Sequence, residues 1–448
     1  MGRSNFSARR SLNWISTQTD AARLIFERAL AHCSIERATD LHVFTENNHL
    51  YIGERAPDAA VDLTTLQSIR IIAAGKAART MLLAILPHLP PCEITGILIA
   101  PKPPTQLPGG FQYFSGGHPL PNEQSFAGAR AALGLAHAAA QEAARTLCIF
   151  LISGGASAMM ELPLDRNISV DDTAAFHRVL VASGAPIADM NCVRKHFSAV
   201  KGGRLALAAG DAPCRSLLVS DVPAGRRDAL ASGPTVPDST TVQQCREILE
   251  QHRLLPQFPL SVRNFFEAST LPETPKATEL TARTCVLLDS ENLANAAKDN
   301  AEALGYTAVI DNTCDEWDYR EAAQYLLDRF RSLRREYGRI CLISAGEVNV
   351  ELPVDPGTGG RNQQFALYCA TLLRPTDGAV AILSAGSDGI DGNSPAAGAV
   401  VEMDIAADPE ASQALVDFNT HPFLRARNAT ITTGPSGNNL RDLRLLLG

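Results

Sequence analysis

Carboxylate side chains follow two strand-like apolar runs in the stretch from Ser344 to Gly398. The runs Arg339–Ser344 and Ala379–Ser384 each end in a glycine-containing loop, with Glu347 after the first and Asp388 after the second. A carboxylate at the end of a strand can hold a metal ion or accept a proton from a hydroxyl group. These two loops are therefore candidates for acid–base or metal chemistry.

A glycine loop with an arginine lies between the two runs. The segment Gly357–Gln363 reads GTGGRNQ, so Gly359 and Gly360 precede Arg361 at the start of a helical pattern. A helix start with a neighbouring guanidinium suits an anion. Together with the nearby acids, this arrangement predicts a site for an anion and a metal ion, and it favours phosphoryl transfer.

The two aspartates of the second loop are spaced as D-x-x-D, with Asp388 and Asp391 around glycines. A calcium-binding EF-hand needs more oxygen ligands and a distal glutamate, and the sequence has none in register. One aspartate could take a proton from a hydroxyl group while another group holds magnesium. The alternative is a turn that the aspartates merely cap.

Three loops in the first half of the chain also follow strand-like runs. Lys76 comes after the run Ser68–Ala74, but the loop is not a phosphate-binding Walker loop, because Ala77 replaces its Ser/Thr. Asp221 follows the apolar run Ser216–Ser220. Lys76 is either a charge aimed at an anion or an ordinary surface lysine. Asp221 is either a metal ligand or base, or a loop cap.

The third loop reads SGGAS and offers hydroxyls and backbone N–H groups at a helix start. It contains Ser153, Gly154, Gly155 and Ser157. A phosphate or carboxylate could bind there, although a tight turn would need the same residues. It is not a nucleophile elbow, because Met159 occupies the position of the last glycine.

Composition narrows the class of protein. The chain has 448 residues, a formal net charge of −8 and 45% hydrophobic residues, so it predicts at least two globular domains. We expect no nucleic-acid partner and no membrane span.

The ten scattered cysteines indicate a reducing compartment and no zinc site. The arginines of the first 19 residues do not make a convincing targeting peptide, and we expect a cytoplasmic protein.

Strand–loop–helix units repeat along the chain and predict an α/β protein with mostly parallel sheets flanked by helices. A proline-rich segment places the boundary near residue 275, giving domains 1–275 and 276–448. The second domain would begin with a strand at Cys285–Leu288, and a short leucine-rich helix would follow the turn Gly434–Asn439.

The loop motifs, taken in order, resemble one known family. They are GKAA at Gly75–Ala78, GGHPLPNE at Gly116–Glu123, SGGASA at Ser153–Ala158, RKHFSAVKGGRLA at Arg194–Ala206, SDVPAG at Ser220–Gly225, ASGPTVPD at Ala231–Asp238, GE at Gly346–Glu347, GTGGRNQ at Gly357–Gln363, SDGIDG at Ser387–Gly392 and TGPSGNN at Thr433–Asn439. The chain resembles the glycerate 2-kinase family, whose C-terminal part is the MOFRL domain. The resemblance implies phosphorylation of D-glycerate to 2-phosphoglycerate with ATP and Mg²⁺. It also implies a Rossmann-like N-terminal domain and an active site in a cleft between the two domains.

The family's functional residues fall on Lys76, Asp221, Glu347, Arg361, Asp388 and Asn439. As the resemblance implies, Lys76 and Arg361 would screen the phosphoryl group and the substrate carboxylate. Asp388 would orient or deprotonate the attacking hydroxyl, and Asp221 or Glu347 would hold magnesium. The loops Ser153–Ser157 and Gly357–Gly360 would supply backbone N–H groups to the phosphate or carboxylate.

Departures from the family pattern leave alternatives open. The loop after Asp221 reads Ala224-Gly225-Arg226-Arg227, where the family has acids, so a related hydroxy or sugar acid could be the substrate. Some family members carry a hydroxypyruvate reductase label, but the chain has no G-x-G-x-x-G fingerprint for a nicotinamide cofactor. A non-catalytic sugar-acid-binding protein is a further alternative. The oligomeric state stays open, with a homodimer as one expectation.

Overall fold

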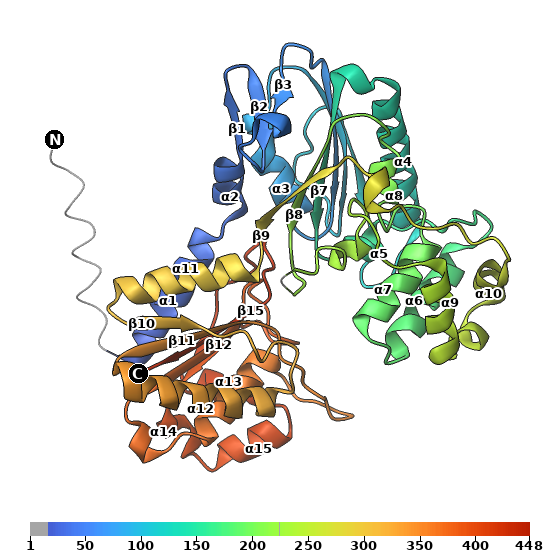
Figure 1. Ribbon diagram of the computed structural model, residues 1–448. Coiled ribbons are helices and arrows are strands. Elements are labelled where there is room, and N and C mark those ends of the chain that lie inside the picture. The colour runs from blue at the N-terminus through green and yellow to red at the C-terminus, as the bar shows by residue number, and fades with distance from the viewer. Residues whose placement is uncertain (1–16, 224) are drawn as a thin grey trace, which may run out of the picture. The chain divides into compact units, whose positions relative to one another are not determined.

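A computed structural model describes residues 17–223 and 225–448, which form two compact units (Figure 1). One unit comprises Ile35–Leu287, here the N-terminal unit. The other, the C-terminal unit, joins residues 288–448 to the N-terminal segment up to Ser34. The arginines near the N-terminus and Ala224 lie outside the described residues. Within the described ranges, no helix is long and apolar enough to cross a membrane.

The N-terminal unit is built on a six-stranded sheet with the order β6-β5-β4-β7-β8-β9. The pairs from β6 to β8 are all parallel, which confirms the predicted α/β class and parallel sheet. The strands are β4 (Ser68–Ala74), β5 (Glu93–Ala100), β6 (Phe111–Ser115), β7 (Thr146–Ser153), β8 (Cys214–Val219) and β9 (Arg283–Leu288). All residues of β7 are buried, as expected for a central parallel strand.

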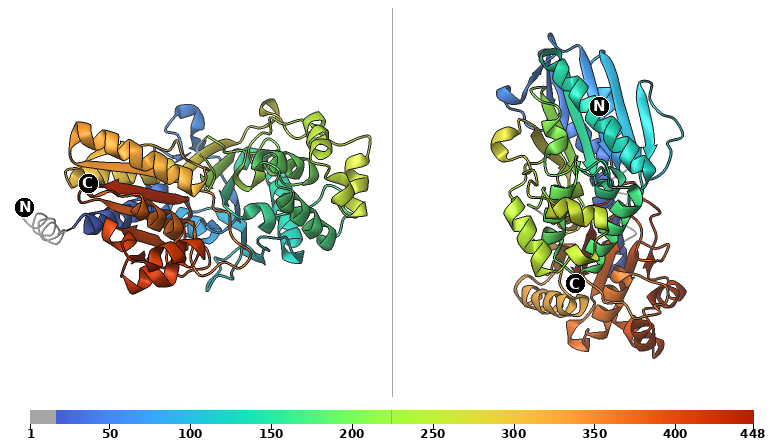
Figure 2. Two further views of the ribbon diagram at one scale, coloured as in Figure 1. Left: turned by 90° about the horizontal axis from the view of Figure 1, so that it is seen from below. Right: turned by 90° about the vertical axis from the view of Figure 1, so that its right-hand side faces the viewer.

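Helices cover this sheet through small side chains. In α4 (Glu123–Gln141), Ala129, Ala132 and Ala136 pack into one core with Ile72 and Phe150 of the strands. Figures 1 and 2 show α4 running alongside the strands. Alanine side chains let the helix approach the sheet closely. The other elements near the sheet are α2 (Ile35–His42), α3 (Ala78–Ile85), α5 (Ala156–Met159), α8 (Arg204–Leu207) and the three-stranded antiparallel sheet of β1 (Val43–Glu46), β2 (His49–Ile52) and β3 (Val61–Asp62).

Four further helices form a separate cluster within the same unit. They are α6 (Val170–Ala182), α7 (Ile187–Phe197), α9 (Val242–Gln251) and α10 (Leu260–Glu267), and Figure 1 shows them together beside the sheet. Phe176 is the centre of their core, with ring centroids 4.2 Å from Phe197 and 5.1 Å from Phe258. The prolines from Pro256 to Pro275, expected to mark a domain boundary, therefore lie on both sides of α10 in this cluster.

The structural division differs from the expected boundary at residue 275. Strand β9 was expected to open the second domain, but it adds to the edge of the first sheet beside β8, so the division falls after Leu287. Helix α1 (Gln18–His32), expected in the first domain, belongs to the C-terminal unit, where Ala22, Ile25 and Phe26 are buried. A single boundary cannot describe a unit built from both ends of the chain.

The C-terminal unit contains a mixed sheet with the order β10-β11-β15-β12-β13-β14. Only β10 and β11 pair in parallel among the described strands of this sheet, so the mostly parallel sheet expected here is an antiparallel-rich one. The strands are β10 (Thr307–Ile310), β11 (Ile340–Gly346), β12 (Ala381–Gly386), β13 (Gly398–Val401), β14 (Thr430–Ile431) and β15 (Asp442–Leu447).

Strand β15 explains this difference. The leucine-rich segment predicted as a helix is a fully buried strand between β11 and β12, antiparallel to both. A short apolar run fits a buried strand or a buried helix equally well, and only the partners decide. Because β11 and β12 both oppose β15, they run in the same direction, and their C-terminal ends share one edge of the sheet.

Helices cover both faces of the mixed sheet. Figure 1 shows α1 and α11 (Ser290–Ala303) on one face, and α12 (Tyr319–Tyr337) with α13 (Arg361–Thr371) on the other. Phe330 of α12 and Phe365 of α13 share a core with Leu342 and Leu446 of the sheet. The remaining helices are α14 (Met403–Ala406), α15 (Glu410–Val416) and α16 (Thr420–Ala426).

Candidate active site

The strand register brings the predicted loops of the C-terminal unit to one sheet edge. Asp442 at the start of β15 is paired with Gly346 at the end of β11 and with Gly386 at the end of β12. Glu347 follows the first glycine directly, and Asp388 lies two residues beyond the second. The sheet thus groups two predicted site residues with a third acid that was not predicted.

Arg361 joins the acids of this edge. Its Nη2 lies 2.7 Å from Glu347 Oε1, and its Nε donates a hydrogen bond of 2.5 Å to Asp442 Oδ2. Burial lowers the pKa of Arg361, but the two carboxylates outweigh it and hold that pKa above the ordinary value. The guanidinium is therefore a fixed positive charge at the start of α13.

The charge balance at Glu347 is unfavourable for its ionised form. Burial raises the pKa of Glu347, and the neighbouring Asp442 carboxylate raises it further, although Arg361 and then Arg441 oppose this. The two arginines therefore do not fully offset the effects of burial and of Asp442 on the Glu347 carboxylate. Such a group gains from a nearby cation or a proton.

Sequence reasoning missed three charged residues of this network. Asp442 accepts from Arg361, and Arg441 donates to Asp315, whose Oδ1 accepts the N–H of Glu347 at 2.9 Å. Arg441 and Asp442 were hidden because their segment was expected to be helical. A strand starting at Asp442 would have placed both at the sheet edge. Nothing in the sequence around Asp315 signals its role.

The D-x-x-D pair divides into two different environments. Asp391 is 1% exposed and accepts the backbone N–H groups of Asn362 (3.0 Å) and Gln363 (2.9 Å) at the start of α13. Burial raises the pKa of Asp391 to about 6 despite these hydrogen bonds. Asp388 is only half-buried, and its Oδ1 accepts the N–H of Ile390 at 3.0 Å. Asp391 therefore caps the start of α13, whereas Asp388 is partly exposed to solvent.

A cavity of about 600 Å³ lies within the C-terminal unit beside these residues. Arg361 and Asp388 both line it, together with Gly359 and Gly360. Its apolar wall consists of Val348, Val350, Leu352, Pro356, Ile390 and Phe418. This size is in the range of small-molecule sites, which combine apolar walls with a few polar groups.

The glycines of the Gly357–Gly360 loop differ from the expected anion donors. The N–H of Gly359 already donates to Asn393 Oδ1 at 2.9 Å. A Cβ atom at Gly360 would lie 2.3 Å from Asp391 Oδ1, so glycine is required for close approach. Because the first N–H groups of α13 bind Asp391, the anion at this helix start is the protein's own carboxylate. Asn439 is also used internally, since its Oδ1 accepts the N–H of Arg441 at 3.0 Å.

The N-terminal unit gathers a second set of predicted residues at the ends of the adjacent strands β4, β7 and β8. Lys76 is exposed, and its backbone N–H donates to the carbonyl of Gly154 at 2.9 Å. A Cβ atom at Gly154 would lie 1.8 Å from Asp221 Oδ2, so the carboxylate packs directly on the glycine backbone. Lys76, Gly154 and Asp221 therefore lie side by side at the ligand edge of a parallel sheet.

The serines of this edge have partners within the protein. Ser153 Oγ accepts the N–H of Ala77 at 3.0 Å, and Ser157 Oγ lies 3.0 Å from Ser232 Oγ. His118 lies close to Gly155, and burial lowers its pKa, as does the Lys76 charge. The neutral imidazole of His118 adds an uncharged hydrogen-bonding group beside the positive charge of Lys76.

These two edges belong to a two-unit α/β protein with charged side chains at the ends of its strands. A family model described as "Domain of unknown function (DUF4147)" matches residues 21–267, and the MOFRL family model matches residues 340–442. The D-glycerate 2-kinase of Thermotoga maritima is 31% identical over 401 residues, which cover 86% of this chain and 93% of that protein. The chain belongs to this glycerate 2-kinase family.

Structure and names of relatives agree with this assignment. A crystal structure of glycerate kinase from Thermotoga maritima matches with a TM-score of 0.81 at 30% identity, covering 96% of this chain and 99% of that one. A protein of Agrobacterium vitis with a provisional hydroxypyruvate reductase name is 31% identical, covering 84% of this chain and 86% of its own. The predicted family resemblance is thus confirmed along most of the chain.

Proposed function

We propose that the protein transfers the terminal phosphoryl group of ATP to the 2-hydroxyl of D-glycerate in the presence of Mg²⁺. The observation that carries the proposal is the cavity of the C-terminal unit, where Arg361 and Asp388 line the same space. A fixed cation and a carboxylate that line one cavity are the two charges that phosphoryl transfer to a hydroxyl group needs. Membership of a family that includes D-glycerate 2-kinases supports the choice of reaction.

The residues would divide the work by charge. Arg361 is held by Asp442 and Glu347, so its guanidinium keeps one orientation toward a phosphate or carboxylate. Asp388 would orient the substrate hydroxyl or accept its proton. Lys76, exposed beside Gly154, would bind an anionic group at the edge of the N-terminal unit.

Magnesium fits the carboxylates of these edges. Mg²⁺ prefers oxygen ligands and commonly binds through one or two carboxylates, water and substrate phosphates. Glu347 and Asp221 each offer such a carboxylate, and the raised pKa of Glu347 indicates a group that would gain from a cation. Bound magnesium would neutralise charge on the phosphate oxygens.

One assay separates the kinase from its alternatives. Purified protein is incubated with D-glycerate, ATP and Mg²⁺, and both ADP and the phosphorylated product are followed. We expect ADP to appear only with all three components, together with 2-phosphoglycerate. NADH oxidation with hydroxypyruvate in the absence of ADP formation would replace the proposal by a reductase. Glycerate binding without either reaction would indicate a binding protein.

A related hydroxy acid is the second candidate substrate. Arg226 and Arg227 follow Asp221 at the position where acids are usual in the family, and Arg227 is exposed. Two added cations would favour a longer or more acidic substrate. A comparison of kcat/KM for D-glycerate and for four- to six-carbon sugar acids tests this choice.

We also propose that the protein acts in the cytoplasm. None of the ten cysteines is joined in a disulfide, which supports a reducing compartment. Fractionation of the source cells with an antibody to the chain would test the location. A homodimer also stays a prediction, and the molar mass measured by light scattering would test it.

A further inference from the structure

Two cysteines and a histidine meet in the helical cluster of the N-terminal unit. Cys192 and His196 lie four residues apart on α7, and Cys245 lies on α9. All three are buried, and their ligand atoms lie within 4.8 Å of one another. Residues i and i+4 share a helix face, so α7 offers two ligands to one point. The sequence predicted no zinc site because packing of α7 against α9, and not local spacing, completes the set.

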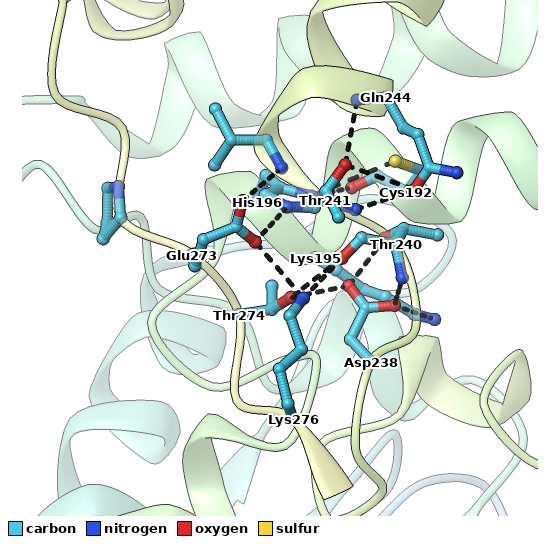
Figure 3. Close-up of polar contacts among 12 residues, drawn as sticks. Cys192, Lys195, His196, Asp238, Thr240, Thr241, Gln244, Glu273, Thr274 and Lys276 are labelled. Carbon is cyan, nitrogen blue, oxygen red and sulfur yellow. Dashed lines mark hydrogen bonds and ion pairs between the residues drawn. The ribbon is translucent and has the colours of Figure 1, made fainter.

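The histidine ring places one nitrogen near a sulfur and the other near an acid. Its Nδ1 donates a hydrogen bond of 2.9 Å to the carbonyl oxygen of Cys192 and lies 4.0 Å from the Cys192 sulfur. Its Nε2 is buried without a hydrogen bond, although Glu273 Oε2 lies 3.9 Å away. Figure 3 shows His196 between Cys192 and Glu273. Metal-bound histidines commonly donate their second N–H to a carboxylate, and Glu273 is placed to accept it.

The donor set of this cluster is soft. Two sulfur atoms and one imidazole nitrogen converge in a buried place. Such a set of thiols and imidazole selects zinc among the common divalent ions.

We propose that Cys192, His196 and Cys245 bind one Zn²⁺ ion that links α7 to α9. His196 binds through Nδ1, which gives up its hydrogen bond to the Cys192 carbonyl oxygen. The Nδ1 proton moves to Nε2, and the new N–H faces Glu273. Both thiols bind as thiolates, and the protons they held pass to solvent, so the metal and two sulfurs are together neutral. Three protein ligands leave a fourth position for water.

The link would stabilise the helical cluster and, through it, the Ser153–Ser157 loop. The chain of contacts begins at Asn191 on α7, whose Oδ1 accepts the hydroxyl of Ser232 at 3.0 Å. Ser232 in turn lies 3.0 Å from Ser157. None of the proposed phosphoryl-transfer residues is a ligand of the zinc site, so this proposal does not depend on them.

Metal content is the first test. The full chain is purified without chelator, and its zinc content is measured by inductively coupled plasma mass spectrometry. We expect about one equivalent in the wild type and at least a tenfold reduction in Cys245→Ser. The matched control is the double variant Cys148→Ser/Cys214→Ser, because these two buried cysteines face each other on adjacent strands without a histidine. That control should keep its zinc.

Cobalt replacement tests the ligands without any variant. The metal-free wild type titrated with Co²⁺ should show thiolate-to-cobalt charge-transfer absorption that saturates at about one equivalent and is displaced by Zn²⁺.

Glu273→Gln should weaken zinc binding about tenfold while leaving the cobalt spectrum intact, as expected for a carboxylate that orients a ligand. Absence of both zinc and cobalt absorption in the folded wild type would overturn the proposal. So would a Cys192–Cys245 disulfide in protein purified under reducing conditions.

Discussion

The two charged sheet edges of this molecule are built in different ways. In the N-terminal unit, Lys76 and Asp221 each lie two residues beyond a parallel strand. Gly154 allows its backbone and the Asp221 carboxylate to touch. In the C-terminal unit, Arg361 is held by Asp442, which reaches the edge from an antiparallel strand. The first edge depends on close approach, whereas the second depends on a network of paired charges. Changes at each edge should therefore fail in different ways.

The largest effect is expected at the second edge. Asp388→Asn keeps the shape of the residue but removes the charge that would orient or deprotonate the substrate hydroxyl. We expect kcat to fall by about 10²- to 10⁴-fold with an unchanged circular dichroism spectrum. Near-normal turnover would remove Asp388 from the mechanism.

At the first edge, Lys76→Met keeps the length of the side chain and removes its charge. Because Lys76 is exposed, the melting temperature should stay within about 1 °C of wild type. Loss of one charged donor to a phosphate should lower kcat/KM by about 10²-fold or more. The matched control Lys102→Met, another exposed lysine, should keep its activity. A Lys76→Met variant as active as this control would show that the first edge binds no substrate charge.

Close approach itself can be tested with Gly154→Ala. The added Cβ would lie 1.8 Å from Asp221, so the carboxylate must move, and we expect at least a tenfold loss of kcat/KM. The control is Gly134→Ala in α4, where a Cβ meets nothing within 4 Å. It should stabilise the protein by about 0.5–1 kcal/mol, because alanine favours a helix. Equal activity of both variants would contradict the contact between Gly154 and Asp221.

The smallest effect concerns the pH dependence of the second edge. Burial raises the pKa of Asp391 from 3.8 to about 6, so the folded protein binds this proton more tightly than the unfolded chain. The free energy of unfolding should therefore decrease as pH rises from about 4 to 6, by no more than about 3 kcal/mol. Asp391→Asn should remove this slope. Its destabilising effect should be largest at acidic pH, because the amide replaces one of two accepting oxygens there without relieving the cost of a buried charge. Urea unfolding of both proteins at several pH values measures the difference.

Sequence reasoning succeeded where local rules decide the outcome. The runs before Lys76, Ser153 and Asp221 are strands of a parallel sheet, and the order of that sheet brings their ends together. It failed where distant partners decide, as at Asp442, whose strand is defined only by β11 and β12. The D-x-x-D spacing likewise could not distinguish the buried cap Asp391 from Asp388, because burial depends on the start of α13.

The position of β15 also has consequences for synthesis of the chain. This strand occupies the middle of its sheet, although it is the last of the strands to leave the ribosome. Until it arrives, β11 and β12 lack their shared partner, and the apolar face of α1, made first, has no complete sheet to cover. The N-terminal unit can close much earlier, because its last strand, β9, lies at an edge. In a nascent chain halted before Asp442, the N-terminal unit should therefore resist protease digestion. Residues 288–441 of the same chain should still be cleaved.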